Sequence, residues 1–134
     1  MVVLDTHHMS LLGWSGVEGS ARLRARLAAL QSAEVVTTII SYEEQVRGWM
    51  AYIGRLRSVT QQVDAYRRLH RQLDNYCRIP VLGFDAPAAV TFQRLHRTRL
   101  GMGTMDLKTT AILLSRNLAD FGRVPGLQVE DWTA

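Results

Sequence analysis

The feature that most constrains the fold is the run of residues near the start of the sequence. Val2, Val3 and Leu4 are consecutive apolar residues, and Asp5 follows them directly. An uninterrupted, β-branched apolar run of this kind predicts a strand that is buried on both faces, as in a parallel sheet. A carboxylate at the end of such a strand is costly to bury unless it caps a helix, accepts hydrogen bonds or binds a metal ion. We therefore expect a functional role for Asp5 at the edge of a sheet.

Strand and helix patterns then alternate along the chain. Residues 34–40 and 80–84 are apolar and rich in β-branched side chains, which predicts two more strands. Apolar residues at three- and four-residue spacing predict helices over residues 21–30, 41–53, 58–77 and 86–96. This alternation predicts an α/β fold, in which a central, mostly parallel sheet of about four strands lies between two layers of helices.

The last part of the sequence leaves more than one assignment open. Residues 99–105 contain two glycines and predict a loop, after which residues 106–114 form either a helix or a turn that leads into a strand at 111–115. We favour the strand, because it would complete the sheet. Residues 117–121 then predict a turn or a single helical turn, and residues 127–132 a terminal strand or an extended tail.

Composition narrows the class of protein. The 134 residues, 47% of them hydrophobic, are enough for one domain over residues 1–134. Cys77 is the only cysteine, so a disulfide within the chain and a multi-cysteine zinc site are excluded, as suits the cytoplasm. The sequence also lacks the pattern of a signal peptide or of a membrane span. The net charge of +4, almost entirely from arginine, fits a polyanionic partner, or arginines that only solvate helix faces.

Acidic side chains follow several of the predicted strands. They are Asp5 after the first strand, Glu43 and Glu44 after the second, Asp106 after the glycine loop, and Asp120 with Asn117 after the strand at 111–115. Because the carboxyl ends of parallel strands share one edge of the sheet, these residues are expected to converge there. Carboxylate oxygens are the ligands that Mg²⁺ and Mn²⁺ prefer, and a divalent ion can activate water for phosphodiester hydrolysis. Acids at helix starts are also common for capping reasons, and Ser41 with Glu44 has the spacing of a capping box.

The sequence resembles the PIN-domain toxins of the VapC type. The resemblance lies in four segments that occur in the same order and span nearly the whole chain: LDTHHMS at 4–10, TTIISYEEQVRGW at 37–49, GTMDLK at 103–108 and LLSRNLADFGRVPGLQVEDW at 113–132. It implies a PIN-like three-layer α/β/α sandwich and a Mg²⁺- or Mn²⁺-dependent endoribonuclease, the toxin of a bacterial type II toxin–antitoxin pair.

The resemblance also implies roles for individual residues. By motif, Asp5, Glu44 and Asp106 match the acids that hold the metal, Glu44 being chosen over Glu43 by its distance from Gly48. The fourth catalytic position falls on Asn117, with Asp120 as a nearby substitute. Arg116 and Arg99 are candidates for binding the RNA backbone.

Partners follow from the same resemblance. A VapB-type antitoxin is expected to pack an apolar helix against the chain and to place a basic side chain in the acidic pocket. The helices that contain Leu23, Leu27 and Trp49 are candidates for that groove, although such stripes are more often core. A homodimer, or a toxin–antitoxin hetero-oligomer, is the expected assembly.

Two departures from the family pattern leave alternatives open. His7 stands where the family commonly has asparagine, and it is either a metal ligand or a support for Asp5. The stretch from Asp106 to Asn117 is short for both a helix and a strand, which raises the alternative of a catalytically weakened module that binds antitoxin or RNA without cleavage. A phosphatase with Asp5 as nucleophile is a third reading, which the absence of an acid at position 7 disfavours.

Overall fold

The structure is a computed structural model, and it describes residues 1–14, 16–31, 34–97, 112–123 and 126–134. Its centre is a sheet in the order β3-β2-β1-β4-β5, in which every neighbouring pair is parallel. The strands are β1 (Val2–Leu4), β2 (Val35–Thr38), β3 (Val81–Leu82), β4 (Ile112–Leu114) and β5 (Gln128–Glu130). The parallel sheet is therefore confirmed, with five strands instead of about four, because residues 128–130 pair with β4 as a strand and are not a loose tail.

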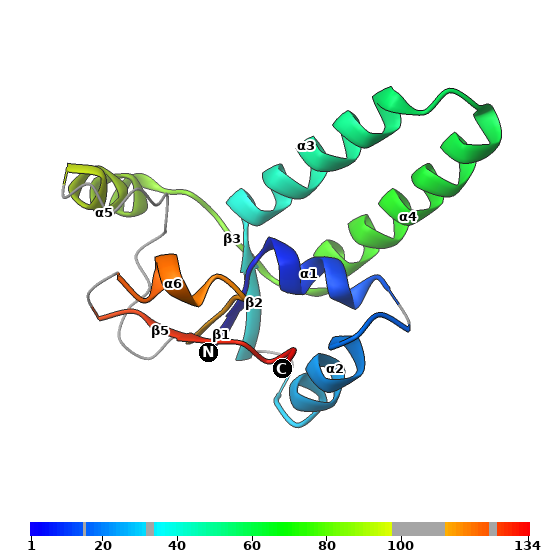
Figure 1. The fold of residues 1–134 in the computed structure, drawn as a ribbon. Helices are drawn as coiled ribbons and strands as arrows, with labels where there is room; N and C mark the ends of the chain where they lie inside the picture. Colours follow the sequence, from blue (N-terminus) through cyan, green and yellow to red (C-terminus); the bar gives the residue numbers. More distant parts are fainter. Residues whose placement is uncertain (15, 32–33, 98–111, 124–125) are drawn as a thin grey trace.

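In the described part of the chain, six helices flank this sheet: α1 (Thr6–Leu12), α2 (Ser20–Ala28), α3 (Ile39–Arg55), α4 (Val59–Arg78), α5 (Ala86–Arg97) and α6 (Leu118–Phe121). Figure 1 shows α1 to α4 on one side of the sheet and α5 with α6 on the other, which gives the expected three layers. The preference for a strand at 111–115 is confirmed by β4. Residues 98–111, which include Arg99 and Asp106, lie outside the described residues.

The core occupies both faces of the sheet, as the opening apolar run predicts. Side chains alternate between the faces of a strand, so Val2 and Leu4 pack with α1, α2 and α4, whereas Val3 packs with Val36 and Leu113 on the opposite face. Leu4 is 0% exposed and Val3 is 1% exposed. β1 is thus completely buried, as expected for the middle strand of the sheet, which has two strands on each side.

The main element that the sequence patterns did not predict is the short helix α1, which begins directly after β1. Asp5 is the N-cap of α1, and its Oδ1 accepts a hydrogen bond from the backbone N–H of His8 at 2.8 Å. Capping the helix is one of the roles that can justify a carboxylate at this position. The chain therefore turns directly from β1 into a helix, and the carboxylate lies at the junction.

The predicted capping box at the start of α3 is wrong. The helix begins two residues earlier than expected, at Ile39, and Thr38 is its N-cap, with its hydroxyl accepting from the backbone N–H of Ser41 at 3.1 Å. Ser41 is thus inside the first turn. Glu44 does not cap the helix, so its carboxylate is available for a role at the edge of the sheet.

The α3–α4 hairpin extends well beyond the sheet, as Figure 1 shows. Its base is fixed to α1 by polar contacts: Gln45 donates to the hydroxyl of Ser10 at 2.8 Å, and Gln72 donates to the carbonyl of Met9 at 3.1 Å. Large apolar side chains of α4 are exposed, among them Val63, Tyr66 and Leu73. They form an apolar face of the helix that the described residues leave largely uncovered.

Three further expectations can be judged on the described residues. Asp85 caps α5 by accepting from the backbone N–H of Ala88 at 2.9 Å, in agreement with a helix that starts at 86. Trp132, the last residue of the segment expected as a terminal strand or an extended tail, is buried in the core beneath the guanidinium of Arg26. Across the described part of the chain, none of the helices combines the length and the apolar character that crossing a bilayer requires.

Candidate active site

A pocket of about 340 Å³ opens at the carboxyl edge of the sheet, above the ends of β1, β2 and β4. Its floor is apolar and is formed by Val3, Leu4 and Leu113. Its polar lining consists of Asp5, Thr6, His7, Thr38, Ser41, Glu44, Ser115 and Asn117. Residues from three separate parts of the sequence therefore meet at one edge, which is the arrangement expected for a ligand site in a parallel α/β fold.

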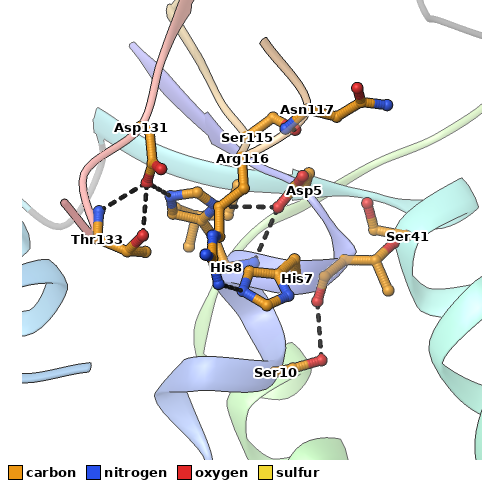
Figure 2. Close-up of polar contacts among 12 residues, drawn as sticks. Asp5, His7, His8, Ser10, Ser41, Ser115, Arg116, Asn117, Asp131 and Thr133 are labelled. Atoms are coloured by element: carbon orange, nitrogen blue, oxygen red, sulfur yellow. Dashed lines mark hydrogen bonds and ion pairs between the residues drawn. The ribbon is translucent and has the colours of Figure 1, made fainter. Parts of the chain in front are cut away.

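Asp5 is held firmly at the bottom of this pocket (Figure 2). Its Oδ1 accepts two hydrogen bonds from His8, one from the backbone N–H at 2.8 Å and one from the ring Nδ1 at 3.1 Å. Burial raises the pKa of Asp5, but hydrogen bonds from His8 and Ser115 outweigh it, so that the pKa lies below its usual value. Asp5 is therefore an ionised carboxylate near neutral pH, and neither contact with His8 uses its second oxygen, Oδ2.

Glu44 reaches the same pocket from the second turn of α3. Its Oε2 accepts a hydrogen bond from the hydroxyl of Thr6 at 2.5 Å, which joins α3 to α1 across the pocket. The neighbouring Glu43 points elsewhere and pairs on the exposed helix surface with Arg47, one turn further on. The two adjacent acids are thus divided between pocket and solvent, as helical geometry requires.

Asn117 lines the pocket on the side of β4. It caps α6, and its amide Nδ2 donates to Oδ2 of Asp120 at 2.9 Å. The Oδ1 of Asn117 in turn accepts from the backbone N–H of Asp120 at 3.4 Å, and Asp120 itself is exposed and is not among the lining residues. Ser115, just before this turn, is fully buried and its hydroxyl accepts from the backbone N–H of Asn117 at 3.0 Å.

His7 lines the pocket and is exposed, and the exposed Arg116 lies against it (Figure 2). The Nη1 of Arg116 lies 3.4 Å from the Nε2 of His7, so the guanidinium donates to the ring. Partial burial lowers the pKa of His7, and the nearby charge of Arg116 acts in the same direction against the opposing effect of Asp5. The Nε2 lone pair of the neutral ring is occupied by this contact, so it is not available to a metal ion while the contact is made, and the exposed guanidinium is the group that suits an anionic ligand.

The donors present fit a hard divalent cation, since Asp5 and Glu44 provide carboxylate oxygens in one pocket. Within the described ranges, however, no group of three or more His, Cys, Asp or Glu side chains is arranged to hold a metal ion. Asp106, the third acid expected from the sequence, is outside those ranges, as is Arg99. Two of the three expected ligands thus face one pocket.

Sequence reasoning missed three residues around Asp5: Thr6, His8 and Asp131. His8 is completely buried and lies between Asp5 and Asp131, which follows β5. Asp131 carries the same signal that identified Asp5, namely an acid at the carboxyl end of a strand. That signal was not usable for Asp131, because residues 127–132 could equally be read as an extended tail.

The architecture and the pocket together define an α/β protein with a central parallel sheet and an acidic pocket at its carboxyl edge. Comparison of the sequence with family models and with curated proteins finds no match.

Solved structures do match the fold. A chain in the crystal structure of DNA-bound VapBC from Salmonella typhimurium superposes with a TM-score of 0.70 at 20% identity, over 98% of this chain and 97% of that one. The structure of FitAB bound to an IR36 DNA fragment gives a TM-score of 0.68 at 18% identity, over 100% and 96% of the two chains. FitAcB from Neisseria gonorrhoeae gives 0.65 at 19% identity, over 98% of both. The fold implied by the sequence resemblance is therefore confirmed.

Proposed function

We propose that this chain is a metal-dependent endoribonuclease and the toxin component of a type II toxin–antitoxin pair. The observation that carries the proposal is that Asp5 and Glu44, far apart in the sequence, line one pocket at the carboxyl edge of the sheet. The likeness of the fold to chains of VapBC and FitAB structures supports the same class.

In this proposal Asp5, Glu44 and Asp106 hold Mg²⁺ or Mn²⁺ through carboxylate oxygens. When bound, such an ion neutralises charge on the phosphate and lowers the pKa of water enough to produce a nucleophile. Asp5 contributes a carboxylate that is ionised and oriented by His8, and Thr6 orients Glu44 through its hydroxyl. Asn117 offers a neutral amide to the same pocket, either to the nucleophilic water or to the RNA.

Arg116 and Arg99 are the proposed contacts for the RNA backbone. Arg116 is exposed, and its guanidinium contacts the ring of His7, which lines the pocket. A guanidinium in this position can pair with a phosphate next to the scissile bond and hold it over the carboxylates.

RNA cleavage with purified protein in Mg²⁺ or Mn²⁺ tests the proposal. Asp5→Asn should lower the rate by more than about a hundredfold, because it removes a charged ligand. Asparagine caps a helix about as well as aspartate, so this variant should remain folded. Glu44→Gln should show a similar loss, whereas Glu43→Gln, the matched change on the outer face of the same helix turn, should cleave at the wild-type rate. Equal activity in all three variants would contradict the assignment.

A module that binds antitoxin or RNA without cleavage is the alternative. It is favoured by the neutral Asn117 at the position where the family carries a fourth acid. The same assay distinguishes the two proposals, since retained RNA binding with no cleavage in either metal would support the non-catalytic module.

An antitoxin is the proposed regulator, and a second groove offers a place for it. This groove is about 390 Å³ in volume, largely apolar, and lined by Trp14, Gly48, Trp49, Tyr52 and Arg68 together with Thr6, Gln45 and Glu44. Because it shares Thr6 and Glu44 with the acidic pocket, a helix packed in it could deliver a basic side chain to the carboxylates. Of the helices named from the sequence, α3 fits this role. Leu23 of α2 does not, because it is 0% exposed and belongs to the core.

A homodimer or a toxin–antitoxin hetero-oligomer is the proposed assembly. The apolar residues exposed on the outer half of the hairpin, such as Met50, Val59 and Tyr66, offer a surface for it. Light scattering of the chain alone and with a co-expressed antitoxin measures which assembly forms.

A further inference from the structure

His8 occupies an unusual position for a histidine. It lies in the first turn of α1 and is 0% exposed, next to Met9 and Leu11 of the core. Burying an imidazole in apolar surroundings costs free energy unless its nitrogens are paired, so an apolar side chain would serve better if only packing mattered. The partners of the two ring nitrogens therefore have to explain why a histidine is buried here.

The two ring nitrogens face two different carboxylates (Figure 2). Nδ1 lies 3.1 Å from Oδ1 of Asp5 at the start of α1, and Nε2 lies 3.8 Å from Oδ1 of Asp131 after β5. An ionised carboxylate only accepts hydrogen bonds, so Nδ1 must be the donor to Asp5. Among the described residues, Nε2 has no hydrogen-bond partner, and the carboxylate of Asp131 is the charged group that faces it.

Asp131 is itself fixed in place. Its Oδ1 accepts from the backbone N–H of Thr133 at 2.8 Å and from the hydroxyl of Thr133 at 2.6 Å. The residue between them, Trp132, is buried in the core. Thr133 also packs closely on Gly19, because a Cβ added at Gly19 would lie only 2.8 Å from the Cβ of Thr133. These contacts thus hold the carboxylate of Asp131 in a fixed position beside the His8 ring.

The contact with His8 determines how Asp5 can bind a ligand. Both hydrogen bonds from His8 fall on Oδ1, which sets the rotation of the carboxylate and leaves Oδ2 unused by His8. The backbone N–H alone would hold the oxygen as an ordinary helix cap. The ring adds a second donor from another direction, and two donors restrict the carboxylate plane more than one does.

We propose that His8 is a positioning residue that holds Asp5 through Nδ1 and is itself oriented by Asp131, so that the end of the last strand sets the geometry of the proposed metal ligand. The proposal rests on the metal-dependent function above, and it assigns to His8 and Asp131 a role that acts only through Asp5. Groups that orient a metal ligand in this way typically change metal affinity about tenfold to a hundredfold when removed.

Variants of His8 separate positioning from packing. In His8→Asn, the side-chain amide nitrogen can replace Nδ1 as donor to Asp5, and Mn²⁺ affinity measured by titration calorimetry should stay within about threefold of wild type. In His8→Gln the amide reaches only the position of Nε2, and in His8→Leu both donors are lost, so both variants should bind Mn²⁺ about tenfold more weakly or worse. Thermal melting of the same samples checks that each variant is folded.

The role of Asp131 is tested by coupling. Asp131→Ala should weaken Mn²⁺ binding in the wild-type background, but not in the His8→Asn background, because asparagine does not reach Asp131. The control is Glu130→Gln, which removes the neighbouring charge, and which should leave Mn²⁺ affinity unchanged. Equal Mn²⁺ affinity in all His8 variants, with changes only in melting temperature, would mean that His8 is a packing residue and would overturn the proposal.

A measurement without metal distinguishes this inference from the proposed function. In the nuclear magnetic resonance spectrum of the wild-type protein, the Nδ1–H proton of His8 should exchange slowly, and Asp5→Ala should abolish that protection. If Asp5→Ala leaves it unchanged, the His8–Asp5 link is wrong even in an active nuclease. If the link is present but wild type neither binds Mn²⁺ nor cleaves RNA, the proposed function fails and the metal-positioning role fails with it.

Discussion

The sheet and the α3–α4 hairpin both carry strong apolar patterns, but the side chains of the sheet are covered and many of those on the hairpin are exposed. In the sheet, Val3 and Leu4 are covered on both faces by helices of the same chain. On α4 an equally regular stripe leaves Val63, Tyr66 and Leu73 between 44% and 57% exposed. The difference teaches that periodicity identifies which face of a helix seeks burial, and does not say which molecule covers it.

The polar groups follow the same division. Near the sheet edge, Asp5, Glu44 and Asp131 each have a hydrogen-bond partner that fixes their orientation. On the hairpin, Asp64 and Arg68 form an exposed ion pair of the kind that contributes little to stability. Side chains that hydrogen bonds hold in a fixed orientation therefore lie at the proposed active site, whereas the hairpin carries the exposed surface that could bind another molecule.

The largest expected effect is a difference in the free energy of unfolding between substitutions in the core and on the hairpin. Leu23→Ala in α2 should lower the free energy of unfolding by about 2–5 kcal/mol, because Leu23 is 0% exposed in the core. Leu73→Ala on the hairpin should cost less than about 1 kcal/mol, since Leu73 is already 44% exposed. Urea unfolding followed by circular dichroism measures both. Similar losses would show that the hairpin is integral to the core.

A pair of glycines on α3 tests whether the groove near Glu44 is a docking surface. A Cβ at Gly48 or at Gly54 meets nothing within 4 Å, and only Gly48 lines the groove. Gly48→Leu and Gly54→Leu should each stabilise the helix by about 0.5–1 kcal/mol. Binding of the antitoxin, measured by calorimetry, should be weakened by Gly48→Leu alone. Unchanged binding in Gly48→Leu would direct the search to the exposed stripe of α4.

The smallest expected effect concerns acid stability at the sheet edge. Burial raises the pKa of Asp131, but hydrogen bonds from Thr133 and the nearby His8 outweigh it, so the pKa lies below the ordinary value of 3.8. A lowered pKa in the folded state means that the unfolded chain takes up the proton first. The stabilisation is therefore present above about pH 4 and is lost as the pH falls through the folded-state pKa.

Asp131→Asn should accordingly flatten the fall in stability between pH 5 and pH 3, measured by thermal melting across that range. Asp64→Asn on the hairpin is the control for the loss of one charge. A pH profile of Asp131→Asn identical to wild type would show that the Asp131 carboxylate gains nothing from its contacts in the folded state.

Much of the fold was predictable from local pattern. The apolar run before Asp5, the β-branched run before residue 39 and the helical spacing over 59–78 each specify an element without reference to the rest of the chain. The short helix α1 was missed because its seven residues give too few turns for a periodic signal, and because Asp5 was read only as a functional acid when it is also a cap. The capping box failed because Thr38 and Ser41 are both good caps, and the choice between them depends on where β2 stops pairing.

The sequence by itself determined that a parallel sheet would carry carboxylates at one edge, because strand burial and the position of an acid after a strand are local properties. Only the tertiary structure decided that His8 lies between Asp5 and Asp131. Those contacts join residues near the two ends of the chain. They arise from the stacking of α1 against the ends of β1, β4 and β5, and no local pattern records that packing.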